Sequence, residues 1–413
     1  MSGTLDGRAG SAAVRRANLA LVLQHLRADG PRSRADLAVE TALNKATISS
    51  LVGDLLSRGL VRETGRRTAG SVGRPAHILE LDGRRLGALG LEVNVGYLAA
   101  YATDLAGRVL LDRRVGFATA DATPASTLRR LVRLAASARD AMARHGAGLA
   151  GIAVAAPGLV DVAVGEVVRA PNLGWSGVAV SDRIAAGLGI ERAAVRVDNE
   201  ANFATLAEFW FGELAGTSDL VYLSGEVGVG GGVIAEGRLI RGADGFSGEV
   251  GHIALGNSDE RCACGRTGCW ETAVGFRRLL ELAGYSPNVS SDPEELLQEI
   301  VQRAAAGESR AVRAFDEIGR QLGAGAAILV NLFNPRTLVL GGYFGRAARQ
   351  LVPEVKNQVR SLTLAGDTRN CQVAASSLGL RAAARGAAGL VVESVLADPA
   401  SVSPWPSVSP RTA

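Results

Sequence analysis

The sequence is poor in cysteine and lacks long apolar segments, and both absences limit what the protein can be. Four cysteines in 413 residues exclude a disulfide-stabilised scaffold. Apolar runs such as Leu86–Leu91 and Gly151–Ala156 are far shorter than the roughly 20 residues that span a bilayer. No basic, apolar leader opens the chain. We therefore expect a cytoplasmic protein that has no membrane partner.

Excess positive charge is also scarce, except at the N-terminus. The formal net charge is only +4, but residues 1–85 contain 14 Lys and Arg against 8 Asp and Glu, whereas the remainder contains 31 against 33. A basic segment on a near-neutral body indicates a polyanion as the partner of that segment alone. A solvated basic surface is the alternative that charge leaves open.

A helix-turn-helix pattern opens the basic segment. Between residues 14 and 27, apolar residues recur at i, i+3, i+4 and i+7, which places on one helix face Leu19, Val22, Leu23 and Leu26. Ser33 is suited to cap a short helix over residues 34–40, and Asn44 to cap a second one that ends at Arg58. Two short helices joined by a tight turn are typical of a helix-turn-helix.

The second of these helices presents a small polar face opposite its apolar one. The apolar stripe is formed by Ile48, Leu51, Val52 and Leu55. The residues that we expect to face DNA are Lys45, Ala46, Thr47, Ser49 and Ser50. Short side chains let a helix enter the major groove, where hydroxyl groups bond base edges or phosphates and a lysine reaches a phosphate. A helical hairpin with an ordinary polar surface is the alternative.

Two predicted strands, residues 60–63 and 76–81, follow the helices and are joined by a basic loop. The loop contains Arg66, Arg67 and Arg74, and an arginine at its tip is favoured by the negative potential of a minor groove. Helices, hairpin and charge together predict a winged helix-turn-helix that binds operator DNA.

The rest of the chain alternates strands and helices. Apolar segments over residues 86–95, 97–103 and 108–115 predict strands, residues 124–145 a helix, and residues 151–156 another strand. Such alternation is typical of an α/β fold, in which ligands bind at the ends of strands. The 52 glycines indicate many tight turns and ligand loops.

Five short motifs carry a family resemblance. They are Ala156-Pro157-Gly158, residues 170–175 (APNLGW), residues 197–202 (VDNEAN), residues 247–252 (SGEVGH), and Cys262-x-Cys264-x4-Cys269-Trp270-Glu271. With them, residues 86–395 resemble the ROK family (repressors, open reading frames and sugar kinases), and the N-terminal segment resembles its repressor branch. The resemblance implies an actin-like (ribonuclease H-like) fold, with two α/β lobes and a sugar bound between them.

A chain of 413 residues is long enough for two or three domains. We expect a DNA-binding domain, a first lobe that is completed by a C-terminal segment, a second lobe that carries a metal loop, and a disordered tail. The expected bounds are 1–82, 83–197 with about 376–397, 198–375 and 398–413. Members of the family commonly dimerise, so the resemblance also implies a homodimer or tetramer, which suits a palindromic operator.

Three cysteines within eight positions, with a histidine ten residues before the first, predict a metal site. Cys262, Cys264, Cys269 and His252 form a Cys3His set of the kind that binds zinc tetrahedrally and leaves no open position. The site is therefore expected to be structural. The resemblance implies the same, with zinc stiffening a loop that contacts the sugar.

The resemblance places the family's sugar contacts on six residues of this chain. They are Asn172, Asn199, Glu200, Glu249, His252 and Glu271. Amide, carboxylate and imidazole groups suit this role, because every sugar hydroxyl that loses water must find a new partner. With one ring nitrogen of His252 on zinc, the other would direct an N–H at a sugar hydroxyl.

Phosphoryl transfer, by contrast, lacks its expected groups. Family kinases carry an aspartate as the base where this chain has Glu200, and a first phosphate loop Asp-x-Gly-Gly-Thr where it has residues 92–96, EVNVG. Val95 resists the backbone conformation that glycine provides. Glu226 would repel a triphosphate beside the second loop, residues 228–232. We therefore assign no catalytic residue and expect neither ATP nor Mg²⁺ as a cofactor.

The sequence thus predicts a transcription regulator, in the simplest case a repressor, that senses a sugar in a degenerate kinase domain. One alternative is an active, ATP-dependent sugar kinase with a DNA-binding head. Another is a regulator that responds to a protein partner and whose sugar pocket is vestigial.

Overall fold

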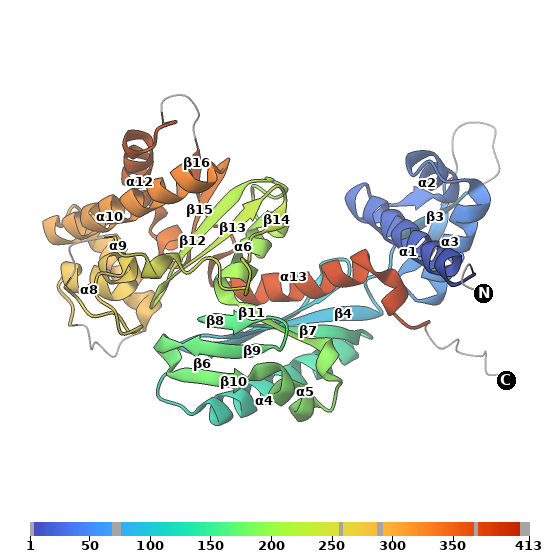
Figure 1. Ribbon diagram of the computed structural model, residues 1–413, viewed down its shortest axis with the longest axis horizontal. Coiled ribbons are helices and arrows are strands. Elements are labelled where there is room, and N and C mark those ends of the chain that lie inside the picture. The colour runs from blue at the N-terminus through green and yellow to red at the C-terminus, as the bar shows by residue number, and fades with distance from the viewer. Residues whose placement is uncertain (1–3, 68–75, 256–258, 287–291, 367–370, 405–413) are drawn as a thin grey trace.

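The computed structural model describes residues 4–67, 76–255, 259–286, 292–366 and 371–404. Figure 1 shows an N-terminal unit (residues 4–81) at one end and a larger body of two lobes (residues 86–397). Among the described helices, none combines the length and the apolar character that crossing a bilayer requires.

The N-terminal unit contains three helices and a three-stranded sheet of order β1-β3-β2. Its elements are α1 (Thr4–Ala28), β1 (Arg32–Ser33), α2 (Arg34–Glu40), α3 (Lys45–Ser57), β2 (Val61–Arg67) and β3 (Ala76–Leu81). The predicted helices and hairpin are all present. Helix α1 begins well before residue 14, and β2 extends to Arg67, beyond the predicted strand end at residue 63.

Side-chain caps fix where α2 and α3 begin. The Ser33 hydroxyl accepts from the Asp36 N–H at 3.1 Å, and the Asp36 carboxylate accepts from the Ser33 N–H at 3.0 Å, which is a capping box. The Asn44 side-chain oxygen accepts from the Thr47 N–H at 2.8 Å. The predicted apolar stripe of α3 is buried, so it fixes which face of this helix remains outside.

The first lobe is built on a five-stranded sheet of order β11-β7-β4-β5-β6. Its strands are β4 (Leu86–Val93), β5 (Tyr97–Asp104), β6 (Val109–Gly116), β7 (Gly148–Ala156) and β11 (Val195–Asn199). Helices α4 (Pro124–Arg144) and α5 (Val180–Leu188) contact this sheet. A small sheet adds β8 (Leu159–Asp161), β9 (Glu166–Ala170) and β10 (Trp175–Ala179).

The second lobe repeats the strand order of the first, as β14-β13-β12-β15-β16. Its strands are β12 (Leu220–Gly225), β13 (Val229–Ala235), β14 (Arg238–Leu239), β15 (Thr337–Gly341) and β16 (Gln372–Ala375). Its helices are α7 (Trp270–Val274), α8 (Phe276–Ala283), α9 (Pro293–Ala305), α10 (Ser309–Phe333), α11 (Gly342–Arg346) and α12 (Ala348–Leu362). In both lobes the first three strands form an antiparallel meander and the last two are parallel additions, which is the two-lobed α/β fold that the sequence predicted.

Two helices join the lobes. Helix α6 (Glu200–Phe211) contacts β12 and β13, and α13 (Ala382–Ala397) contacts β4 and β7 while also packing along α6. Gly386 permits this packing, because a β-carbon there would overlap the Phe203 carbonyl oxygen. The predicted lobe boundary at residue 197 falls inside β11, whose residues all pair with β7.

The prediction of a disordered tail from residue 398 is wrong for its first residues. Pro399–Ser401 forms a turn of 3-10 helix, η5, and Arg58 of the N-terminal unit donates to the Ala400 carbonyl at 3.0 Å and to the Val402 carbonyl. Arg58 thus gives the carbonyl groups of these residues hydrogen-bond partners, which the sequence of the tail alone could not predict. Residues 405–413 lie outside the described part of the chain.

Candidate functional site

A polar cleft of about 90 Å³ lies between the two lobes. Strands β4 and β11, the turn between β12 and β13, and the 3-10 helices η1 (Pro171–Leu173) and η3 (Val250–His252) bring their ends to it. Five of the six predicted sugar contacts line its wall: Asn172, Asn199, Glu200, Glu249 and His252. The structure therefore gathers in one cleft residues that are up to 80 positions apart in the sequence.

Glu271, the sixth predicted contact, stands behind this wall. A β-carbon on Gly228 would lie 2.8 Å from its Oε2 and 3.1 Å from the Asn172 Nδ2. Only the absence of a side chain at Gly228 lets these two polar groups approach the cleft. The glycine-rich turn therefore serves the polar wall, a role that glycine spacing alone did not identify.

Asn199 is already engaged by the protein. As the N-cap of α6, its side-chain oxygen accepts from the Ala201 N–H at 2.7 Å, and its amide nitrogen donates to the Gly158 carbonyl at 2.9 Å. The same side chain thus fixes the start of α6 and the turn after β7. One amide N–H remains for a ligand.

Asp198 holds the strand that carries Asn199, and sequence reasoning did not identify it as a site residue. It is 2% exposed, pairs with Arg241 at 3.0 Å and accepts from the Asn202 side chain at 2.8 Å. A buried carboxylate with a cationic partner and a hydrogen bond is well compensated. The signal that could have indicated it is its place in the VDNEAN motif.

Buried carboxyl groups dominate the deep part of the cleft. Burial, with the charges of neighbouring carboxylates, raises the pKa of Glu92 to about 8 and raises the pKa of Glu200 well above its usual range. Burial also raises the pKa of Glu226 and Glu249. The Tyr97 hydroxyl donates to Glu92 Oε1 at 2.7 Å, but Glu92 Oε2 and Glu200 Oε2 are buried and have no partner among the described residues. The cleft therefore offers carboxyl oxygens that can bond a ligand hydroxyl, as acceptors when ionised or as donors when protonated.

Two of the residues predicted to replace phosphate-loop positions bond each other across the lobes. The Asn94 amide, at the end of β4, donates to Glu226 Oε2 in the β12–β13 turn at 2.5 Å. The backbone N–H groups of these turns also have internal acceptors: Asn94 N–H bonds the Tyr97 carbonyl and Glu226 N–H the Gly228 carbonyl, and Gly96 N–H lies 3.4 Å from the Asn94 side-chain oxygen. These three N–H groups are thus already engaged within the protein.

The four predicted metal ligands come together beside the cleft. Their ligand atoms lie within 4.8 Å of one another, with 3.6 Å between Cys264 Sγ and Cys269 Sγ and 3.6 Å between Cys262 Sγ and His252 Nδ1. Tetrahedral bonds of about 2.3 Å to zinc require sulfurs about 3.8 Å apart, so the set fits such an ion. His252 turns Nε2 the other way, toward Glu249 Oε2 at 3.8 Å.

The predicted DNA-facing residues lie on the outer face of α3. Lys45, Ala46, Ser49 and Ser50 are exposed, and Thr47 is half-buried. Arg15 of α1, which sequence reasoning missed, donates to the Ser50 hydroxyl at 3.2 Å and pairs with Asp54 at 3.0 Å. A guanidinium therefore stands beside the small hydroxyl face. The basic pair of residues 15 and 16 was the available signal.

The hairpin supports part of the predicted basic loop. Strands β2 and β3 pair antiparallel as far as Arg67 and Ala76, with an irregular step between Thr64 and Arg66. Arg66 and Arg67 thus end β2, next to the loop. Arg74 lies outside the described residues.

The two-lobed body and its cleft of sugar-type hydrogen-bonding groups define a sugar-kinase-like domain. The chain belongs to the ROK family, whose family model matches residues 88–394. The xylose repressor of Caldicellulosiruptor bescii is 31% identical over 398 residues, which cover 94% of this chain and 98% of that protein. The family and the fold predicted from the sequence are both confirmed.

Two solved structures match different shares of the chain. A ROK family transcriptional regulator, a homologue of the E. coli MLC protein, is 28% identical with a TM-score of 0.78 and covers 93% of this chain and 97% of its own. A ROK family glucokinase from Streptomyces griseus, in complex with glucose and AMPPNP, is 29% identical with a TM-score of 0.64 and covers 74% of this chain and 98% of its own. The regulator thus extends over nearly the whole chain, whereas the kinase does not.

Glu92 provides a test of the carboxyl cluster. Its pKa is about 8, against an ordinary value of 4.5. A carboxyl whose pKa is raised by folding stabilises the fold fully below its ordinary pKa, and this contribution disappears as the pH rises through the folded pKa. We therefore expect Glu92→Gln to change little at pH 5 and to raise the free energy of unfolding by about 2 kcal/mol or more at pH 9.

Urea unfolding of both proteins at these two pH values measures this difference. The exposed Glu191 supplies the matched control, and Glu191→Gln should follow the wild type at both. If the stability of Glu92→Gln depended on pH as that of the wild type does, the raised pKa of Glu92 would be contradicted.

Proposed function

We propose that this protein is a transcriptional repressor that binds operator DNA through its N-terminal unit and responds to an unphosphorylated sugar in the interlobe cleft. One observation carries the proposal: the cleft keeps its sugar-directed groups, while the hydrogen bond from Asn94 to Glu226 occupies the positions of the two phosphate loops. Sugar binding is retained in this account, and phosphoryl transfer is lost.

The state of the backbone amides supports the loss of kinase activity. Kinases of this kind hold nucleotide phosphates with free backbone N–H groups and a metal ion. Here the N–H groups of Asn94 and Glu226 already have carbonyl acceptors. A triphosphate would have to break these bonds and approach the Glu226 carboxyl at the same time, so we expect no productive ATP complex.

The charge of the cleft supports a neutral effector. Four glutamates line it: Glu92, Glu200, Glu226 and Glu249. No lysine or arginine of the described chain does so. Hydroxyl groups of a sugar can bond these carboxyl groups in either protonation state, whereas a phosphate group would lose its hydration and meet no cation in the described lining. The relative named xylose repressor makes xylose the first sugar to test.

The metal site supports a structural zinc ion. Four ligands fill a tetrahedral coordination sphere, and when bound the ion would tie His252 to the three cysteines through Nδ1. His252 Nε2 would then be fixed on the cleft side, as an N–H donor for a sugar hydroxyl. Arg169 of the first lobe also donates to the Cys264 carbonyl at 3.0 Å, so the metal loop lies between the lobes.

Metal analysis tests this site with a matched pair of cysteine variants. We expect one zinc per wild-type chain, loss of that zinc in Cys269→Ser, and a fall of several kcal/mol in the free energy of unfolding, because metal binding contributes to folding. Cys371 lies outside the cluster, so the Cys371→Ser variant should retain its zinc. Equal zinc in both variants would contradict the assignment.

The N-terminal unit supports DNA binding as a winged helix-turn-helix. Helix α3 would enter the major groove with Lys45, Ala46, Thr47, Ser49 and Ser50, and the hairpin would place Arg66, Arg67 and Arg74 near the backbone or minor groove. Two copies of the chain, as a homodimer or within a tetramer, would match the half-sites of a palindromic operator.

Thermal stability of the zinc-loaded protein tests the proposed function. Xylose, glucose and N-acetylglucosamine should be compared with their phosphates and with Mg-ATP, because a ligand that binds the folded state raises its stability by mass action. We expect one free sugar to raise the melting temperature by several degrees, in the wild type and Glu191→Gln but not in Glu249→Gln.

Each other outcome has a definite meaning. A shift with Mg-ATP, followed by consumption of ATP with the same sugar, would establish a kinase. A shift only with a sugar phosphate would contradict the neutral effector. No shift with any sugar would favour control by a protein partner.

A further inference from the structure

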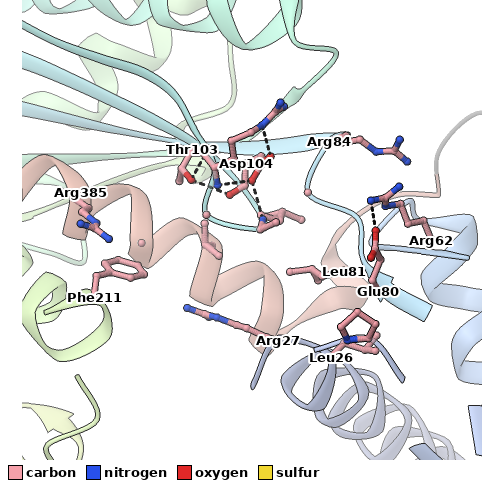
Figure 2. Close-up of a pocket in the computed structure, with 18 of the residues that line it drawn as sticks. Leu26, Arg27, Arg62, Glu80, Leu81, Arg84, Thr103, Asp104, Phe211 and Arg385 are labelled. Carbon is pink, nitrogen blue, oxygen red and sulfur yellow. Dashed lines mark hydrogen bonds and ion pairs between the residues drawn. The ribbon is translucent and has the colours of Figure 1, made fainter. Parts of the chain in front are cut away.

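A second cavity of the described chain is larger than the interlobe cleft. A space of about 650 Å³ lies between the N-terminal unit and the first lobe, within the range of small-molecule sites. Figure 2 shows that its walls come from both parts: the end of α1 and strand β3 on one side, and the β5–β6 turn, Phe211 and α13 on the other. A molecule bound here would touch the DNA-binding and the sugar-binding parts together.

Arginines surround this cavity, and one of them is not paired. Four of the five have carboxylate partners: Arg27 with Glu393, Arg62 with Glu80, Arg84 with Asp82, and Arg108 with Asp104. Arg385 forms no ion pair with any described residue. Burial raises the pKa of Glu208, and the charge of Arg385 acts on that carboxyl in the opposite direction. The Glu208 carboxylate, however, accepts its hydrogen bond from the Ser376 hydroxyl. Arg385 is thus a half-buried cation that could bind an anionic ligand.

The surroundings of Arg385 favour a flat organic molecule over a bare ion. Its guanidinium lies 4.8 Å from the centre of the Phe211 ring, and the Tyr101 hydroxyl, which senses the same charge, has no hydrogen-bond partner among the described residues. Apolar side chains form part of the remaining wall, between the paired arginines and their carboxylate partners: Leu26, Leu81, Leu105 and Val392. The cavity thus combines an unpaired cation and a phenol with patches of apolar surface.

We propose that this cavity is a second effector site, distinct from the sugar cleft, for a small organic anion with a planar apolar body, such as an aromatic carboxylate or an aryl phosphate. Arg385 and Tyr101 bind the anionic group, and the apolar walls bind the ring. Because the walls belong to both parts of the chain, an occupied cavity favours the arrangement in which the N-terminal unit rests on α13. The site therefore adds a second input to the DNA-binding unit.

Calorimetric titration of the full chain with phenyl phosphate and with benzoate tests the proposal. We expect one molecule to bind per chain, at least tenfold weaker binding in Arg385→Gln, and partial recovery in Arg385→Lys, which keeps the charge. Arg381, four residues earlier on the same segment, is exposed and pairs with Asp112, so Arg381→Gln should bind both probes as the wild type does.

Two further titrations distinguish this cavity from the sugar cleft and from a site for bare phosphate. A sugar that binds the cleft should still bind when the cavity is saturated with phenyl phosphate, and inorganic phosphate should bind at least tenfold more weakly than phenyl phosphate. The proposal is overturned if neither probe binds at millimolar concentration, if Arg385→Gln binds as tightly as the wild type, if inorganic phosphate binds equally well, or if the sugar displaces the probe.

Discussion

Helix α13 can pack against both β4 and α6 because glycine stands at each contact. A β-carbon on Gly90 would overlap the Ala384 carbonyl oxygen, and one on Gly386 would overlap that of Phe203. Where backbones pack this closely, there is little free volume, so a shift of one element displaces its neighbour. The geometry of the whole body therefore depends on where α13 lies.

The same helix connects the sugar cleft with the N-terminal unit. Helix α6 begins at Glu200 in the cleft and packs along α13. Near its other end, α13 bears Glu393, which pairs with Arg27 of α1, and the turn that follows it accepts from Arg58. Figure 1 shows α13 running from the lobes toward the N-terminal unit. A sugar that shifts α6 has a continuous set of packed contacts to the DNA-binding helices.

Much of this arrangement could be predicted from local sequence. Caps at Ser33 and Asn44, the apolar stripe of α3 and the spacing of three cysteines each depend on residues a few positions apart, and such patterns survive in any context that buries them. The hydrogen bond from Asn94 to Glu226 could not be predicted, because it joins residues 132 positions apart. Sequence indicated only that each residue was unsuited to phosphate.

The contacts between the N-terminal unit and the body could likewise not be predicted from the sequence. Arg58 was expected only to end a helix, and the tail after residue 398 only to lack structure, yet the two bond each other. The cavity beside Arg385 exists because the N-terminal unit and the first lobe meet there, and no sequence motif indicates this contact. Surface charge was visible in the sequence, but the pairing of that charge was not.

Hydrogen exchange on the full-length protein, with and without the sugar that stabilises it, tests the central claim most directly. If α13 links the cleft to the N-terminal unit, the sugar should alter amide exchange in α6, in α13 and in the last turns of α1, because these segments open together. Changes confined to the cleft loops, with α13 and α1 unaffected, would contradict the account.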